Sequence, residues 1–305
     1  MPMFPIVPLR EGYIQFREYK TWYCIVGDLA NTLPGKFPVL MLHGGPGIPH
    51  DRLEPLRALA KTGRPIVFYD QLGCGNSDRP DNSSLWSVEL FLDELATVRR
   101  FLGLERIHLF GHSWGGMLAM EYALTQPDGI LSLTLASSPA NIPLWIAETK
   151  RLREELPLKV QQTLLLHEAD STTDDPAYSE AMMVYYHRHV CRLSPWPEFV
   201  KRGVEKKGKQ VYETMLGPSE THVIGRLKNW EIASRLSFIQ IPSLLTSGRY
   251  DEFTPTQAAV IHDGIPDCTW VLFEKSSHMP HAEETEHYLK VLNDFLTQIE
   301  GLVKT

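Results

Sequence analysis

The sequence has few cysteines and no pattern that would tie them together. Its four cysteines, scattered over 305 residues without C-x-x-C spacing, are Cys24, Cys74, Cys191 and Cys268. Disulfide-held secreted domains and structural zinc sites both depend on characteristic cysteine spacing. The twelve histidines show no H-E-x-x-H or other metal-ligand spacing either. We therefore expect reduced, mostly packing thiols in a cytoplasmic protein, with no metal site and no cofactor.

Long apolar runs and an excess of basic charge are also absent. No stretch approaches the roughly 20 apolar residues that span a bilayer. The proline-rich N-terminus lacks the basic region and the long apolar stretch of a secretory signal. The 30 basic residues are outnumbered by 37 acidic ones, which gives a net charge of −7. This balance argues against nucleic acid as a partner, and we expect no membrane partner.

What the chain does have is enough length and apolar content, 305 residues at 43% hydrophobic, for a large core. Strand-like and helix-like patterns alternate over residues 1–137 and again over 236–305. Between them, over residues 138–235, helical segments follow one another and strand-like runs vanish. This organisation predicts an α/β fold with a mostly parallel central sheet flanked by helices. Residues 1–137 and 236–305 would form the core, and 138–235 an inserted all-helical cap, or lid.

The predicted elements have these residue ranges. Two antiparallel strands are expected near the N-terminus, at 12–19 and 21–26, and further strands at 37–43, 65–70, 107–110, 130–136, 241–247 and 269–273. Helices are expected at 51–61, 85–102, 144–156, 159–168, 177–191, 197–207, 255–263 and 282–300, with a last helical stretch in the insertion toward Arg235.

The most informative stretch is residues 111–115, GHSWG, which match the pattern G-x-S-x-G. A short apolar run comes before it and a helical pattern follows it. This context places Ser113 on a sharp strand-to-helix turn, where small residues on either side let neighbouring segments approach. The turn exposes the hydroxyl at a helix N-terminus, where negative charge is favoured. We therefore predict that Ser113 is a nucleophile.

A serine hydroxyl needs a base to remove its proton, and the base needs a third group to orient it. In hydrolases with this alternation of strands and helices, the acid and the histidine follow the serine on loops after later strands. Asp251 follows the predicted strand 241–247, and His278 follows the predicted strand 269–273. The order predicts a catalytic triad of Ser113, Asp251 and His278.

The acid and the base of this triad have rivals. Glu252 is adjacent to Asp251, but we expect the shorter aspartate to fit the position better. His281 lies three residues after His278, and we expect it to be a structural surface histidine at the start of a helix, because the base must lie in the loop. Asp70 also ends a predicted strand, and we expect it to brace the glycine-rich turn that follows.

A second glycine-rich segment, HGGPG at residues 43–47, ends the strand predicted at 37–43. Such a cluster frees backbone N–H groups from side-chain crowding, so that a loop can aim them at a developing anion. A plain turn after a strand is the alternative. The position directly after a strand, and ahead of Ser113, favours an anion-binding loop.

Together these motifs resemble the α/β-hydrolase fold, and more closely the prolyl aminopeptidase (proline iminopeptidase) family of serine peptidases. The resemblance covers nearly the whole chain. It depends on HGGPG at 43–47, YDQLG at 69–73, GHSWGG at 111–116, GPSE at 217–220, YDE at 250–252 and SH at 277–278.

The resemblance implies a role for each matching residue. Ser113 would attack the substrate carbonyl, His278 would act as general base and then as acid, and Asp251 would hold the imidazolium. The backbone N–H groups of Gly45 and Trp114 would bind the oxyanion.

The same resemblance implies a substrate-binding site formed by Glu220, Glu252 and Gly44. The two glutamates resemble the acidic pair that binds the free α-amino group of the substrate in this family. An ammonium beside carboxylates in a closed pocket gains charge-assisted hydrogen bonds, whereas a blocked N-terminus leaves the carboxylates unpaired. From the residues alone, Glu220 could also be a solvated loop carboxylate.

The chain departs from many bacterial members at His112, where they have glycine, and at Gly116, where they have serine. It is more similar to the branch that includes tricorn-interacting aminopeptidases and amino-acid amidases. We expect a serine aminopeptidase that removes an N-terminal residue, proline foremost, from short peptides through an acyl-enzyme. The alternatives are an L-amino-acid amidase, a small-molecule esterase or lactonase with the same triad, and a non-catalytic ligand-binding protein of this fold.

Overall fold

The computed structural model describes residues 9–303. The proline-rich N-terminus, and with it the expectation that it is not a secretory signal, lies outside the described residues. Within 9–303, no helix is both long and apolar enough to cross a membrane.

The described strands form one eight-stranded sheet in the order β1-β2-β4-β3-β5-β6-β7-β8. The antiparallel pairs, β1 with β2 and β2 with β4, involve β1 (Leu9–Phe16), β2 (Tyr19–Val26) and β4 (Ile66–Tyr69). The other pairs are parallel. Their further strands are β3 (Val39–Leu42), β5 (Ile107–His112), β6 (Ile130–Ala136), β7 (Ser243–Gly248) and β8 (Cys268–Phe273).

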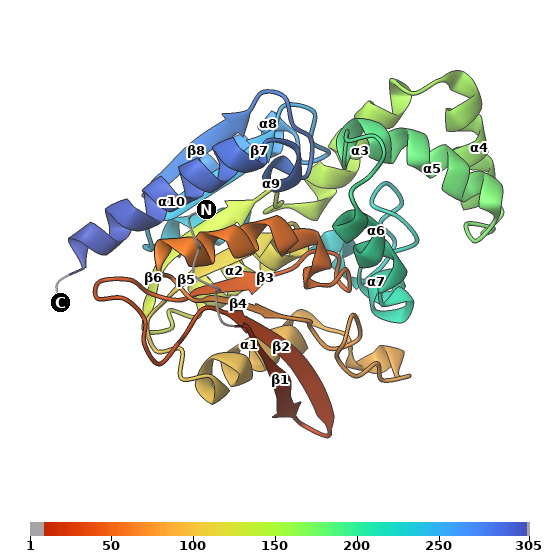
Figure 1. Ribbon diagram of the computed structural model, residues 1–305. Coiled ribbons are helices and arrows are strands. Elements are labelled where there is room, and N and C mark those ends of the chain that lie inside the picture. Colours follow the sequence, from red (N-terminus) through yellow and green to blue (C-terminus); the bar gives the residue numbers. More distant parts are fainter. Residues whose placement is uncertain (1–8, 304–305) are drawn as a thin grey trace, which may run out of the picture.

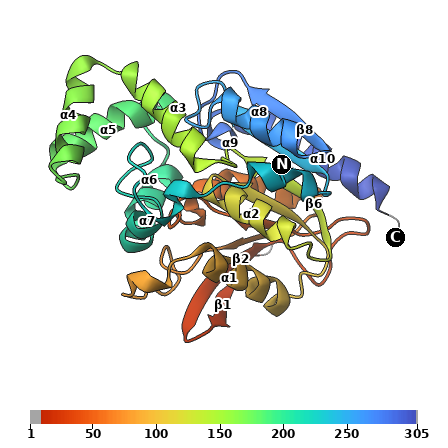
Figure 2. The same ribbon diagram turned by 180° about the vertical axis from the view of Figure 1, so that it is seen from behind.

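Successive residues of the parallel strands point to opposite faces, and each face is covered by helices. Leu40 and Leu42 of β3 belong to one hydrophobic core, and Val39 and Met41 to the other. The first core includes α1 (Val88–Phe101), α2 (Trp114–Leu124) and α8 (Pro255–Gly264), which Figure 2 shows on the near side of the sheet. The second includes the 3-10 helix η1 (His50–Thr62) and α10 (Thr285–Leu302), which lie in front in Figure 1. The predicted three layers are therefore present.

The chain leaves the sheet after β6 and returns at β7, and we call the intervening residues 137–242 the insertion. Its helices are α3 (Ile142–Glu154), α4 (Leu158–Ala169), α5 (Pro176–His189), α6 (Glu198–Glu205), α7 (Lys209–Met215), η3 (Arg226–Asn229) and η4 (Ala233–Phe238). Figure 1 shows α4 and α5 projecting away from the sheet, whereas α6 packs on η1. Side chains of α3, α4 and α5 form a small core of their own. The stretch expected to be helical toward Arg235 is thus divided into one short α-helix and two 3-10 turns.

Local sequence signals explain where several helices begin. Ser87, Asn141 and Asp175 each accept a hydrogen bond from a backbone N–H in the first turn of α1, α3 and α5. Pro176 then occupies the first position of α5, where a missing N–H costs nothing. The cap at Asn141 starts α3 two residues earlier than its apolar periodicity predicts. The remaining short helices are η2 (Ser83–Leu85) and α9 (Pro280–Glu283).

Candidate active site

Ser113 lies at the junction of β5 and α2 with φ 55° and ψ −120°, a strained conformation for a residue with a side chain. Small neighbours make this turn possible. A Cβ atom on Gly115 would collide with the carbonyl group of Leu42 in β3. The predicted strand–turn–helix context of Ser113 is therefore present, and its side chain lies in the wall of a pocket.

Asp251 follows β7 and His278 follows β8, as their positions in the sequence predict. Nδ1 of His278 lies 2.8 Å from Oδ1 of Asp251, and both residues are buried. The backbone N–H of Phe253 also donates to Oδ1 of Asp251, over 2.8 Å. His278 lines the same pocket as Ser113. No hydrogen bond among the described residues joins the two, and such contacts commonly tighten only when substrate is bound.

The surroundings of His278 favour its protonated form. Burial lowers the pKa of the imidazole, but the charge and the hydrogen bond of Asp251 raise it. With further contributions from Glu252 and Glu220, the net result is a pKa above the ordinary value for histidine. Asp251 thus stabilises a positive charge on the imidazole of His278.

The two rivals of Asp251 do not take its place beside Nδ1 of His278. Oε1 of Glu252 is 3.9 Å from Nε2 of His278, on the ring edge opposite Asp251. Asp70 accepts hydrogen bonds from two groups of His50 and from the backbone of Asn76, so it braces its turn as expected.

His281 is fully buried, and its expected surface position is wrong. Its Nε2 donates to the carbonyl oxygen of Arg52 over 2.9 Å. The physical reason is that α9, which contains His281, packs against η1.

The HGGPG loop lies against Ser113, and Gly44 and Gly45 both line its pocket. Gly45 has φ 116°, and a Cβ there would lie 2.5 Å from the backbone nitrogen of Gly47. The HGGPG loop and the turn that carries Ser113 are held together by Gln71. Its side chain accepts a hydrogen bond from Nε1 of Trp114 at 2.7 Å, and its backbone N–H donates to His43 at 2.8 Å. The YDQLG motif at 69–73 indicated the turn that follows β4. It did not indicate that Gln71 connects the HGGPG loop to the turn at Ser113.

Glu220 and Glu252 come together in the same pocket, one from the insertion and one from the loop after β7. Oε2 of Glu252 is buried and has no hydrogen-bond partner among the described residues. Burial, with the charges of Glu220 and Asp251 and against that of His278, raises the pKa of Glu252 to about 8. Oε2 of Glu220 accepts a hydrogen bond from the Tyr186 hydroxyl at 2.6 Å. Glu220 is therefore a half-buried pocket residue and not a solvated loop carboxylate.

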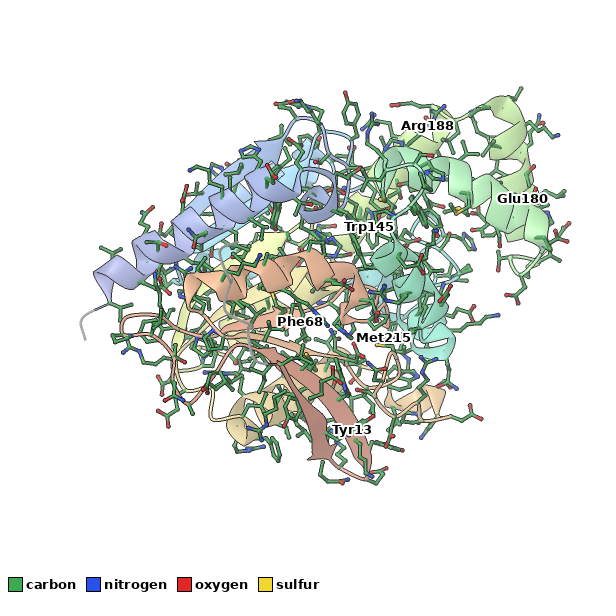
Figure 3. The ribbon with its side chains drawn as sticks, viewed as in Figure 1. Tyr13, Phe68, Trp145, Glu180, Arg188 and Met215 are labelled. Atoms are coloured by element: carbon green, nitrogen blue, oxygen red, sulfur yellow. The ribbon has the colours of Figure 1, made fainter. Side chains whose placement is uncertain are left out.

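The pocket is small, with a cavity of about 10 Å³, which is room for roughly one water molecule. Trp145 of α3, labelled in Figure 3, closes it together with Glu220 of the insertion. Ile48, Arg52 and His112 complete the wall, and sequence reasoning assigned none of them to the site. Within residues 9–303, no group of three or more His, Cys, Asp or Glu side chains is placed to hold a metal ion.

Comparison with known proteins shows the family to which this chain belongs. The family described as alpha/beta hydrolase fold matches residues 38–285. A proline iminopeptidase from Heyndrickxia coagulans is 43% identical over 266 residues, which are 87% of this chain and 92% of that protein. This chain belongs to the proline iminopeptidase family. The resemblance and the α/β-hydrolase fold class predicted from the motifs are confirmed, and as a member of this family the chain is a hydrolase.

Two solved structures extend the likeness of this proline iminopeptidase family member over nearly its whole length. The structure of VinJ has a TM-score of 0.92 at 43% identity, covering 95% of this chain and 99% of that one. The proline iminopeptidase of Mycobacterium smegmatis has a TM-score of 0.89 at 38% identity, covering 97% and 100%. With such coverage, the likeness includes most of the insertion as well as the sheet.

Proposed function

We propose that this protein is a serine aminopeptidase that releases an N-terminal residue, proline foremost, from short peptides. The names of its relatives support the reaction class. One observation carries the assignment: the buried, unpaired Oε2 of Glu252 beside Glu220 in the pocket of Ser113. Ionising a buried carboxyl group with one free oxygen is costly, and the α-ammonium of a substrate supplies a charged partner for that oxygen.

The chemistry we propose is acyl transfer in two halves. Ser113 Oγ attacks the scissile carbonyl carbon while His278 takes the hydroxyl proton, with Asp251 stabilising the imidazolium. The N–H groups of Gly45 and Trp114 bind the oxyanion. The C–N bond then breaks, and His278 gives its proton to the leaving amine. Water attacks the acyl-enzyme by the same steps and releases the amino acid.

The ammonium site also selects the substrate. Glu220 and Glu252 would each form a charge-assisted hydrogen bond to a free N-terminal amine, and Gly44 would contact the same residue of the substrate. An N-acetylated substrate has no charge to offer, so it would leave both carboxylates without the ammonium as a partner. Esterase and lactonase substrates have no need of such a pair, which is why we place these activities second.

We propose further that residues 138–235 act as a cap domain over a core formed by 1–137 and 236–305. The separate small core of α3, α4 and α5 supports this division. Because a cavity of about 10 Å³ cannot hold a proline residue, the cap must move to admit substrate. A closing cap would exclude folded proteins and pass short peptides. The four free cysteines fit a reducing, cytoplasmic location.

The test is a paired assay with Ser113→Ala as blank. Proline, alanine and leucine arylamides are compared with their N-acetylated forms and with p-nitrophenyl acetate. We expect strong cleavage of the free-amine arylamides, proline first, and none of the acetylated ones. Cleavage of the ester alone would move the protein to the esterase class, and activity retained in Ser113→Ala would refute the nucleophile.

A further inference from the structure

A second cavity of about 80 Å³ adjoins the pocket of Ser113. The two cavities share Ile48, Arg52 and Glu220 in their walls. Most of the second cavity is lined by apolar and aromatic side chains of the insertion, and its remaining charged wall residue is Lys207, which follows α6. A substrate bound at Ser113 therefore has a neighbouring chamber with two cationic side chains.

Neither cation has an acidic partner. Among residues 9–303, no carboxylate lies within ion-pair distance of Arg52 or Lys207, although neighbouring basic residues are paired. Asp51 is 3.1 Å from Arg202 and 3.2 Å from Lys206. Nε of Arg52 is buried without a hydrogen-bond partner.

Lys207 Nζ lies 4.2 Å from the ring centroid of Tyr212. Burial lowers the pKa of Lys207, and the nearby charge of Arg52 lowers it further, against an opposite contribution from Glu220. The two cations thus repel each other in the wall of the second cavity, and an anion placed between them would relieve that repulsion.

A glycine of the insertion, Gly203, makes room for the side chain of Arg52. Gly203 of α6 lies against the stem of Arg52, and a Cβ atom at that position would be 2.7 Å from Cγ of Arg52. Any larger residue there would push the guanidinium away from its present course. The path of Arg52 into the wall of both cavities therefore depends on a glycine in the insertion.

We infer that Arg52 and Lys207 form a subsite for the C-terminal carboxylate of the substrate, so that dipeptides are the preferred class of peptide. This inference rests on the proposed function. A dipeptide has its ammonium and its carboxylate at most about 7 Å apart. Two acids, Glu220 and Glu252, and two bases, Arg52 and Lys207, surround adjoining cavities, which complements a zwitterion. Guanidinium and ammonium groups are the usual partners of a carboxylate.

The experiment compares prolyl-alanine with prolyl-alanine amide, which differ only in the terminal charge. For the unmodified protein we expect kcat/KM to be at least about tenfold higher for the acid, the size of one charged hydrogen bond. Arg52→Met and Lys207→Met should each lower this preference, and the double variant should bring it close to one. The ratio is measured on one preparation, so it does not depend on how much of a variant is folded.

Lys201→Met is the matched control. Lys201 is an exposed lysine of α6 that pairs with Glu198 at 3.7 Å and lines neither cavity. Its removal should leave the preference for the acid unchanged. A proline arylamide, which carries no carboxylate, should be cleaved by Lys201→Met within about twofold of the unmodified protein.

The outcomes separate the inference from the proposed function. Equal cleavage of acid and amide by the unmodified protein would overturn the carboxylate subsite and leave the aminopeptidase intact. Equal losses of activity on the acid and the amide in Arg52→Met would also overturn the carboxylate subsite. Arg52 would then only orient Glu220 or stabilise the fold, and would not bind the terminal carboxylate. Failure to cleave any free-amine proline substrate would instead refute the proposed function.

Discussion

Replacing Glu252 by glutamine removes a charge from the pocket at almost constant volume. Glu252 is 1% exposed, so the ammonium that it would bind is shielded from water. A hydrogen bond between charged groups contributes about 2 kcal/mol in such a place, which corresponds to roughly a 30-fold loss of kcat/KM. The full loss applies only where Glu252 is ionised in the unmodified protein.

The pKa of about 8 for this carboxyl gives the prediction a pH dependence. A group with that pKa is ionised to roughly one tenth at pH 7 and to one half at pH 8. The ratio of unmodified protein to Glu252→Gln should therefore rise about fivefold over this interval. Because the same substrate is used with both proteins, ionisation of its own amine cancels. In the variant, the pKa of His278 should be lower, because Glu252 contributes to its raised value. The pH at which the variant reaches half of its maximal activity should therefore also be lower.

The assay is the cleavage of proline arylamide and of p-nitrophenyl acetate between pH 6 and pH 9. Glu180→Gln is the control, because Glu180 is an exposed residue of α5 on the outer side of the insertion (Figure 3). It should match the unmodified protein on both substrates. Equal losses on arylamide and ester in Glu252→Gln, or a ratio that does not change with pH, would refute the ammonium site.

Two further predictions concern pH and stability. In the unmodified protein, kcat/KM should decline as the pH falls and His278 is protonated. Because the pKa of His278 is raised, the midpoint of this decline should lie above the ordinary pKa of histidine. A pH–rate profile with its midpoint below that value would contradict the role of Asp251. Arg64→Met should lower the free energy of unfolding in urea by about 2 kcal/mol, because buried Glu300 loses its guanidinium partner and keeps Lys36, at 2.9 Å, as a cation. The pKa of Glu300 is lowered to about 2, so its stabilising contribution is lost as the pH falls from about 4.5 toward 2. If acid unfolding of Arg64→Met had the same midpoint pH as that of the unmodified protein, this contribution of the ion pair would be refuted.

The sequence predicts the scaffold of the site better than its walls. Ser113, Asp251 and His278 each follow a strand that the apolar pattern reveals, and parallel strands bring their carboxyl ends to one edge of the sheet. Chain order along a known architecture was therefore enough to predict where these residues meet. The acidic pair needed more, because Glu220 lies in the insertion, where no strand fixes its position. The resemblance to a family supplied it.

The residues that sequence reasoning missed share a physical cause. Arg52 and Lys207 are separated by about half of the chain, and Lys207 follows Arg202 and Lys206, which form ordinary ion pairs with Asp51. Which of these cations lacks a partner depends on the packing of α6 against η1, and helical periodicity does not encode that. The burial of His281 has the same origin, since a four-residue helix leaves too short a pattern to show which side is covered.

The two ends of the insertion are joined to each other just outside the sheet. The N–H of Ile142 donates to the carbonyl oxygen of Trp230, and the N–H of Ile232 donates to that of Ala140, each at 2.9 Å. These two bonds form an antiparallel bridge beyond the ends of the parallel strands β6 and β7. The inserted chain thus starts and finishes on a shared narrow stem. Such a stem makes the insertion a module: helices beyond it can be lengthened, shortened or grafted from a relative without altering the strands that carry Ser113, Asp251 and His278. New substrate preferences could then arise by exchange of this one piece, while the chemistry below it is inherited unchanged.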